Sequence, residues 1–174
     1  SQRKAVESAI EATATKHNEF VKVRQRANEL GDKMFYQRGF LDYRGRMYLS
    51  RCVISYQGGD LQRSLVEFAK GKTVRKADMK WLWIHLANTY DEKGTPDQRE
   101  QAAKKLKKKF LRWGKNPAKT YKEWKKECTD DKWQCIRACI ELAALDKNPN
   151  HKSTLICEID QSTSCLQHRS ENRR

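Results

Sequence analysis

Apolar residues recur at every third or fourth position along most of this chain, which is the spacing of helices that bury one face. We predict a long, highly charged helix over residues 2–33 with Gly31 as its stop signal. A second strongly amphipathic helix is predicted over residues 76–90. Its apolar face consists of Met79, Leu82, Trp83, Leu86 and Tyr90.

Four more helices follow from start signals combined with the same spacing. Asp60 is predicted to cap a helix that ends at Gly71, with an apolar face of Leu61, Leu65, Phe68 and Ala69. Thr95 and Pro96 start a helix that runs to Gly114 with an apolar face of Ala103, Leu106, Phe110 and Trp113. Asn116-Pro117 starts the next helix, and Thr129 caps the last one. The apolar face of that last helix is Trp133, Ile136, Ile140 and Ala143.

Two stretches have the residues of strands instead. Residues 35–56 are rich in aromatic and β-forming side chains, and we predict short strands joined by a turn at Arg44-Gly45-Arg46. Residues 155–159 predict a further strand, reached through a turn at 148–150 and followed directly by Asp160. The predicted fold class is therefore α+β, mostly helical with a few short strands.

The net charge of the chain indicates what kind of partner it binds. The chain has 174 residues, enough for one core, with 37 Lys and Arg against 22 Asp and Glu and a net charge of +15. This balance predicts a polyanionic partner, nucleic acid first and an anionic membrane surface second. Five lysines crowd residues 104–109, either as a solvated face or as a nucleic-acid contact. No apolar run approaches the roughly 20 residues of a membrane span, so we predict no membrane insertion.

Cysteine and histidine positions argue against a zinc site. The six cysteines are scattered without Cys-x-x-Cys pairs, and with no secretion signal visible we expect reduced thiols. Cys135 and Cys139, one helical turn apart, are predicted to be buried small apolar groups. His85 has no second ligand nearby in sequence, which favours a packing or hydrogen-bonding role. A cytoplasmic location is predicted.

The richest chemistry lies at residues 153–168. Strand alternation places Asp160 at the end of the predicted strand on its more polar side, before a turn of small residues. A carboxylate in that place can hold a divalent cation over a cleft. It can equally cap a turn or a following helix, and the residues by themselves favour the cap.

Several motifs in order change this balance. Asp160-x-Ser-x-Ser-x-x-Gln-His resembles the first catalytic motif of single-subunit, phage-type and mitochondrial-type DNA-directed RNA polymerases. Asp42-Tyr43-Arg44-Gly45-Arg46 resembles the Asp-x-x-Gly-Arg motif of the same family, and segments between the two motifs follow the family's order. The resemblance implies a helix leading into the palm from the thumb side over residues 1–34. It further implies a partial palm domain with a helical insertion over 35–168 and a polar tail over 169–174.

The resemblance also implies a site. It makes Asp160 a catalytic residue and a Mg²⁺ ligand, with the backbone carbonyl of Gln161 as another ligand. Independently of the resemblance, Lys70 and Lys72 project from the end of the helix predicted from Asp60 to Gly71, either as phosphate contacts or, more commonly for such lysines, as solvated side chains. Contacts to the template or to the RNA–DNA hybrid fall on Asp42, Arg44, Gly45, Arg46, Ser164, Gln167 and His168. Cys165 departs from the family, which has Gly at that position.

Two family motifs are missing from this sequence, which contains no His-Asp and no Tyr-Gly pair. We therefore expect a subunit or fragment of a phage-type DNA-directed RNA polymerase that is inert without a second chain. Its partners would be DNA template, RNA product and ribonucleoside triphosphates. Such a protein would work in a host cytoplasm if phage-encoded, or alternatively in mitochondria. The alternative function is a non-catalytic basic nucleic-acid-binding protein, a decayed polymerase remnant.

Overall fold

The computed structural model describes residues 2–50, 52–91 and 93–157, and within them the fold is mostly helical with two small antiparallel sheets. This confirms the predicted fold class. The chain order is α1 (Gln2–Leu30), β1 (Gly39–Leu41), β2 (Met47–Leu49), α2 (Asp60–Ser64), β3 (Lys72–Thr73), α3 (Met79–Thr89), α4 (Pro96–Lys105), α5 (Lys107–Lys115), α6 (Tyr121–Glu127), α7 (Lys132–Lys147) and β4 (Lys152–Ser153).

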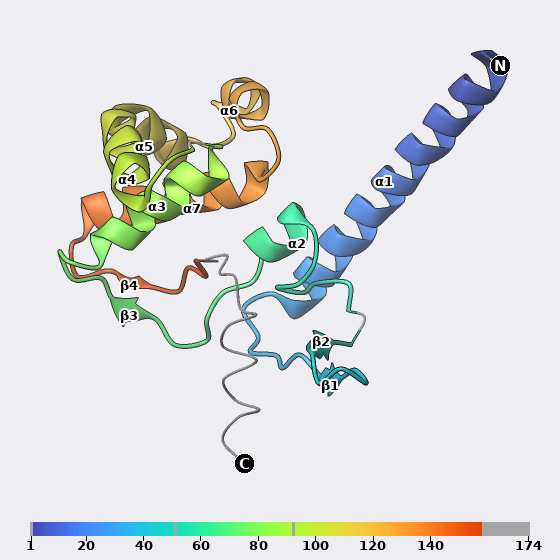
Figure 1. Ribbon diagram of the computed structural model, residues 1–174, viewed down its shortest axis with the longest axis horizontal. Coiled ribbons are helices and arrows are strands. Elements are labelled where there is room, and N and C mark those ends of the chain that lie inside the picture. Colours follow the sequence, from blue (N-terminus) through green and yellow to red (C-terminus); the bar gives the residue numbers. More distant parts are fainter. Residues whose placement is uncertain (1, 51, 92, 158–174) are drawn as a thin grey trace.

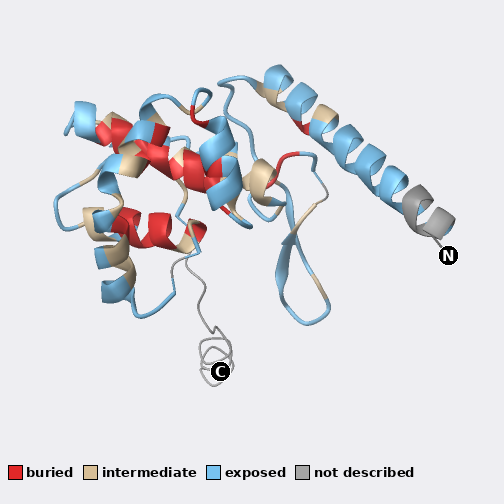
Figure 2. Ribbon diagram, turned by 90° about the horizontal axis from the view of Figure 1, so that it is seen from above, coloured by how far each residue is buried: buried red, intermediate tan, exposed pale blue. Residues whose placement is uncertain are grey.

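Helices α3 to α7 form one cluster, which we call the helical cluster, and it contains most of the buried side chains (Figures 1 and 2). Phe110 and Trp113 of α5 are fully buried, and Tyr90 meets the Phe110 ring edge-on with ring centroids 5.5 Å apart. Burying each such side chain contributes about 1.5–3 kcal/mol. The predicted apolar face of the helix at 76–90 is confirmed, because Leu82, Trp83 and Leu86 are all buried.

Helices α5 and α7 approach closely at Gly114. A Cβ at this position would lie 2.0 Å from the carbonyl oxygen of Cys139, so only glycine fits against the α7 backbone. Cys139, Cys135 and Cys128 are free and buried, as predicted for the first two of them. A hydrogen bond with Cys135, together with burial, raises the pKa of the Cys128 thiol, so this sulfur stays protonated and unreactive.

The helix predicted from Thr95 to Gly114 is in fact two helices that meet at Leu106. Leu106 ends α4 and begins α5 with φ −88° and ψ 5°. The start signal is confirmed, since Thr95 and Gln98 form a reciprocal capping box. The break has a tertiary cause: α4 packs against α3, whereas α5 packs against α7. One straight helix cannot follow both neighbours.

The helix predicted from Asp60 to Gly71 is much shorter, because α2 ends at Ser64. Leu65 and Phe68, expected on its buried face, are 44% and 57% exposed. Beyond α2 the chain extends instead, and the Phe68 N–H donates to the carbonyl of Thr154 at 2.9 Å. Pairing with a distant segment therefore replaces the helix here.

Asp60 caps a different helix from the one predicted. Its carboxylate accepts hydrogen bonds from the backbone N–H groups of Trp133 (2.8 Å) and Gln134 (3.0 Å) at the start of α7. Those N–H groups have no partner within their own helix, so a carboxylate there stabilises the helix end. Helix α7 accordingly begins at Lys132 after Asp131, and the prediction of Thr129 as its cap is wrong.

Two further boundaries differ from the predictions. Helix α6 begins at Tyr121 rather than at Pro117, because residues 117–120 form a turn closed by Thr120 N–H and the carbonyl of Asn116 at 3.1 Å. The strand predicted at 155–159 lies earlier, as β4, whose Ser153 and Lys152 pair with Lys72 and Thr73 of β3. Residues 154–157 carry no strand assignment, and residues 158 and 159 lie outside the described part of the chain.

Helix α1 projects away from the helical cluster, and the β1–β2 hairpin lies beside its C-terminal end (Figure 1). The helix ends at Leu30, and Gly31 follows with a left-handed φ of 51°, which confirms the predicted stop. Val23 is buried, while nearly all other described side chains of α1 are exposed. Gln62 of α2 donates to Glu19 of α1 at 3.3 Å, which ties this helix to the rest of the chain.

Candidate nucleic-acid interface and the approach to Asp160

The hairpin turn between β1 and β2 is organised by Asp42. One carboxylate oxygen of Asp42 accepts the backbone N–H of Arg44 at 2.8 Å and that of Arg46 at 2.9 Å. The backbone of Asp42 closes the turn by pairing with Arg46 and Gly45. Gly45 has a φ of 74°, a conformation that favours glycine. The predicted turn at Arg44-Gly45-Arg46 is confirmed, and Asp42 is the residue that shapes it.

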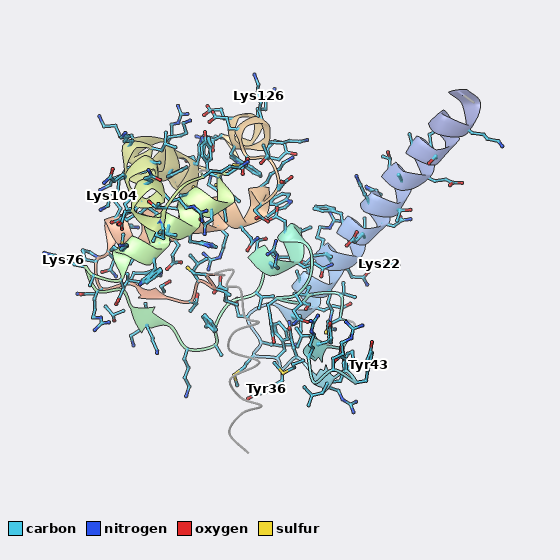
Figure 3. The ribbon with its side chains drawn as sticks, viewed as in Figure 1. Lys22, Tyr36, Tyr43, Lys76, Lys104 and Lys126 are labelled. Carbon is cyan, nitrogen blue, oxygen red and sulfur yellow. The ribbon has the colours of Figure 1, made fainter. Side chains whose placement is uncertain are left out.

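This turn presents two guanidinium groups to solvent. Arg44 lies over the Tyr43 ring, 5.0 Å from the ring centroid, and its Nε donates to the Tyr43 hydroxyl at 2.8 Å. Arg46 is exposed, and its side chain makes no ion pair or hydrogen bond within the described residues. Tyr43 is labelled at the tip of the hairpin in Figure 3. Two exposed arginines beside a glycine can grip phosphate oxygens while the backbone approaches closely.

Lys70 and Lys72 lie beside residues 152–157, which lead in sequence to Asp160 and which we call the approach segment. They line a hollow of about 390 Å³ together with Phe68, Ser153 and Leu155, beside the β3–β4 pairing. The ammonium groups of both lysines are exposed and make no ion pair within the described part of the chain. The fold therefore brings two free cations next to the segment that leads into the Asp160 motif.

A network of charged side chains, which the sequence analysis missed, holds this approach segment against α7. Glu141 is only 3% exposed and accepts from Arg137 at 3.3 Å, while its other oxygen lies 3.0 Å from the His151 Nε2. Arg137 also pairs with Glu67, and Glu67 accepts the Thr154 hydroxyl at 2.6 Å. Burial alone would raise the pKa of Glu67, but the Thr154 hydrogen bond and the Arg137 charge outweigh it and lower that pKa.

Five predicted site residues lie outside the described residues: Asp160, Gln161, Ser164, Gln167 and His168. Their side chains therefore have no described surroundings, and their assigned roles stay predictions. Within residues 2–50, 52–91 and 93–157, no group of three or more His, Cys, Asp or Glu side chains could hold a metal ion.

Two further observations bear on partners. An apolar groove of about 590 Å³ runs between α2, α6 and α7 and is lined mainly by Leu65, Tyr121, Trp124, Trp133 and Ile140. Among the helices that the structure describes, none combines the length and apolar character needed to cross a membrane.

Comparison with known proteins gives one family. Residues 72–171 match the family described as DNA-dependent RNA polymerase. The mitochondrial DNA-directed RNA polymerase of Neurospora crassa is 33% identical over 141 residues, which are 79% of this chain and 10% of that protein. The chloroplastic DNA-directed RNA polymerase 3B of Nicotiana tabacum is 34% identical over 140 residues, 77% of this chain and 14% of the relative.

A mammalian relative agrees with these. The mitochondrial DNA-directed RNA polymerase of Mus musculus is 32% identical over 147 residues, covering 82% of this chain and 12% of the mouse protein. The chain thus spans between about a tenth and a seventh of the length of these relatives.

Proposed function

This chain belongs to the DNA-dependent RNA polymerase family, and we propose that it is a part of a phage-type single-subunit enzyme that copies DNA into RNA. The observation that carries the proposal is the family match, which extends from Lys72 across the Asp160 motif. The exposed arginines of the hairpin and the net charge of +15 suit a polyanionic template. Ribonucleoside triphosphates are the proposed substrates.

In this proposal the hairpin holds the template strand or the RNA–DNA hybrid. Asp42 braces the turn, so Arg44 and Arg46 present their guanidinium groups from a backbone that is already ordered. An ordered loop loses less conformational entropy on binding than a free one. Ser164, Gln167 and His168 would contact the same nucleic acid. Lys70 and Lys72 would meet phosphates beside the approach segment.

Asp160 and the backbone carbonyl of Gln161 are the proposed Mg²⁺ ligands of this chain. Divalent cations in such sites activate the attacking hydroxyl and stabilise the leaving pyrophosphate. Magnesium prefers oxygen ligands, and a carboxylate with a carbonyl provides them. With no His-Asp or Tyr-Gly pair here, the remaining ligands and the nucleotide-binding helix would come from further polymerase sequence. The contribution of the described residues is to tether the approach segment through β3–β4 and Glu67.

The test is RNA synthesis by this chain completed with the missing motifs of a relative, on one polypeptide or two. Asp160→Asn retains size and hydrogen-bonding capacity but removes the charge that Mg²⁺ requires. We expect synthesis to fall on the order of 10³-fold or more, with folding and template binding unchanged. A near-normal rate in this variant would leave the non-catalytic nucleic-acid-binding protein as the better function.

The hairpin is tested in the same assay. Arg46→Ala should weaken retention of the template or hybrid, so short abortive products should dominate while the metal site stays intact. Arg75→Ala is the matched control, because Arg75 is also exposed but pairs with Asp78 at the start of α3. Equal product lengths from both variants would remove the hairpin from the proposed interface.

The cellular compartment of this protein can be proposed from the compartments of its relatives. Those compared above are mitochondrial or chloroplastic enzymes. We therefore favour an organelle, with a host cytoplasm as the alternative for a phage-encoded polymerase. Imaging of the tagged full-length protein in its own cell distinguishes the two.

A further inference from the structure

The basic charge of this chain is concentrated on a part of the fold that the proposed active site does not use. Between Pro96 and Glu127, twelve Lys and Arg face only four Asp and Glu. This stretch forms α4, α5 and α6 on the side of the helical cluster remote from the hairpin. Figure 3 shows Lys126 projecting outward from α6, far from Tyr43 on the hairpin.

The lysines of this stretch differ in what they contact. Lys104 pairs with Glu100, Lys107 and Lys115 lie within ion-pair distance of Asp146, Lys109 pairs with Glu127, and Lys125 lies over the Tyr121 ring. Another group is exposed and makes no ion pair or hydrogen bond within the part of the chain that the structure describes. These are Lys105, Lys108, Lys119, Lys122 and Lys126, which we call the unpaired lysines. Their charges remain available to an external anion.

Lys108 of α5 and Lys126 of α6 lie on the outer sides of two helices that are joined by an ion pair. Lys108 is two residues before buried Phe110, and Lys126 is two residues after buried Trp124. At 3.6 residues per turn, each therefore points about 200° away from its buried neighbour. The residues directly after them in sequence, Lys109 and Glu127, pair across the two helices at 2.6 Å. Lys108 and Lys126 are thus both exposed, and each directly precedes one member of this interhelical ion pair.

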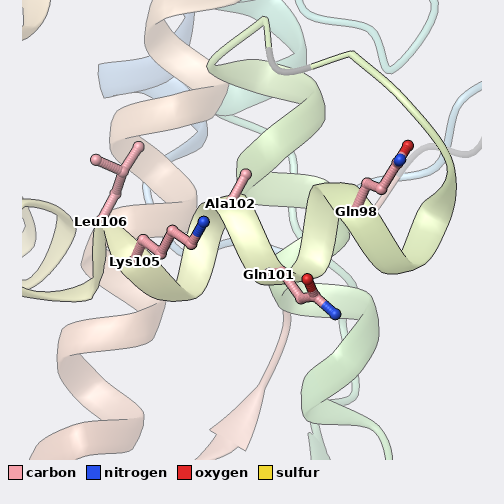
Figure 4. A pocket seen from close by; sticks show the side chains of 5 residues that line it. All are labelled: Gln98, Gln101, Ala102, Lys105 and Leu106. Atoms are coloured by element: carbon pink, nitrogen blue, oxygen red, sulfur yellow. The ribbon is translucent and has the colours of Figure 1, made fainter.

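The basic stretch also carries neutral hydrogen-bond donors, but it has little surface for base stacking. Figure 4 shows Gln98, Gln101 and Lys105 around a shallow hollow of about 340 Å³ on α4. Glutamine side-chain amides, like lysine ammonium groups, can donate hydrogen bonds to phosphate oxygens. Tyr121 is the exposed aromatic ring of α6, and it already contacts Lys125 and the edge of Trp124. Single-strand binding relies on free aromatic platforms, so this surface fits a duplex backbone better.

We propose that the unpaired lysines on α4, α5, α6 and the turn between α5 and α6 form a second nucleic-acid surface, which binds the phosphate backbone of duplex DNA without sequence preference. It would hold template DNA at a distance from the hairpin. The choice of DNA rests on the proposed function, whereas the existence of the surface rests on the lysine geometry. Each phosphate contact releases a counterion, so binding weakens steeply with salt.

The experiment measures affinity of the whole chain for a short duplex DNA as a function of potassium chloride concentration. One triple variant changes Lys108, Lys122 and Lys126 to Gln, and a matched variant changes Lys104, Lys107 and Lys115 to Gln. Both lose the same charge from the same part of the fold. We expect the slope of log K against log salt to shrink by about 1 for each unpaired lysine and to change little in the matched variant.

Each outcome has a defined meaning. Equal effects of the two triple variants would show that only net charge matters, and the proposal would fail. The proposal would also fail if the chain bound single-stranded RNA, or vesicles of anionic phospholipid, more tightly than duplex DNA and the unpaired-lysine variant abolished that binding. The variant Arg44→Ala with Arg46→Ala separates the two sites. If it alone removes duplex binding, the hairpin proposal stands and this one is overturned, whereas loss only in the unpaired-lysine variant supports the second surface.

Discussion

The helical cluster and the β1–β2 hairpin are built in opposite ways. In the cluster, Trp113 is completely buried and the aromatic side chains contact one another. In the hairpin, Tyr43 and Leu41 are 88% and 69% exposed, and each strand has only three residues. The cluster is stabilised by burial of apolar surface, whereas the hairpin is shaped by the hydrogen bonds of Asp42.

This difference teaches where stability and recognition lie. A two-stranded hairpin without a covered face is marginal in water, so its apolar side chains are available to nucleic acid or to further protein. The cluster buries its own core without such a partner, and the exposed side chains of α4, α5 and α6 are rich in lysine. The following predictions test this contrast, from the largest expected effect to the smallest.

Trp113→Ala should destabilise the cluster by about 3–5 kcal/mol, because it opens a cavity in a fully packed core. Phe40→Ala on the hairpin removes an exposed ring and should change the free energy of unfolding by less than about 1 kcal/mol. Urea unfolding followed by circular dichroism measures both. Comparable losses would mean that the hairpin shares the core and that the contrast is false.

Acid should destabilise the cluster through His85. Burial lowers the pKa of His85 to about 4 from 6.5, with Asp131 opposing this shift and Arg63 adding to it. The unfolded chain therefore binds the proton first, and stability is lost as the pH falls from 6.5 towards 4, by about 3 kcal/mol in all. His85→Leu should flatten that pH dependence in urea unfolding. Exposed His17→Gln should preserve it, and an unchanged slope in the Leu variant would contradict the assignment.

Two glycines should respond differently to alanine. Gly114→Ala places a Cβ against the Cys139 carbonyl, so α5 must move from α7 at a cost of about 1–3 kcal/mol in global stability. Gly45→Ala meets no atom within 4 Å but strains a φ of 74°, which disturbs the hairpin locally. Thermal unfolding should fall clearly in the first variant alone. A larger shift for Gly45→Ala would place the hairpin inside the cooperative unit.

The smallest expected change in stability comes from replacing Asp60 or Asp42, each of which accepts hydrogen bonds from two backbone N–H groups. Asp60→Ala frees the first N–H groups of α7 and should cost about 1 kcal/mol of cluster stability. Asp42→Ala should loosen the hairpin turn without changing cluster stability. Amide hydrogen exchange resolves the two, with faster exchange at Trp133 and Gln134 in the first variant only. Faster exchange there in both variants would show that the regions are coupled.

Local patterns were sufficient for the elements whose partners lie nearby in sequence. The capping box at Thr95, the helix stop at Gly31 and the hairpin turn at Gly45 all follow from residues within a few positions. The family was also predictable, because the order of its motifs along the chain can be recognised in the sequence alone. Helical spacing likewise predicted that Leu82, Trp83 and Leu86 are buried, although α3 is buried over all of residues 82–87.

The candidate site was only partly predictable. The hairpin turn was expected, and the role of Asp42 as its brace was added by the structure. The network around Glu141 was missed, although an acidic residue inside the apolar run Cys139–Leu145 was a usable signal for a buried, paired carboxylate. The pair of Glu100 and Lys104 follows from i,i+4 spacing, but the pairing of Lys107 and Lys115 does not, because Asp146 lies on α7 and these two lysines lie on α5.

The sequence by itself determined the family, the helical character, the turn chemistry and the excess of positive charge. The tertiary structure alone decided where helices break and which groups meet. Leu106 bends because α4 and α5 follow different neighbours, and α2 stops early because the chain beyond it pairs with the segment before Asp160. Asp60 serves a helix more than seventy residues away. Local propensity amounts to less than about 1 kcal/mol for an ordinary residue, so burial and distant hydrogen bonds override it wherever the two conflict.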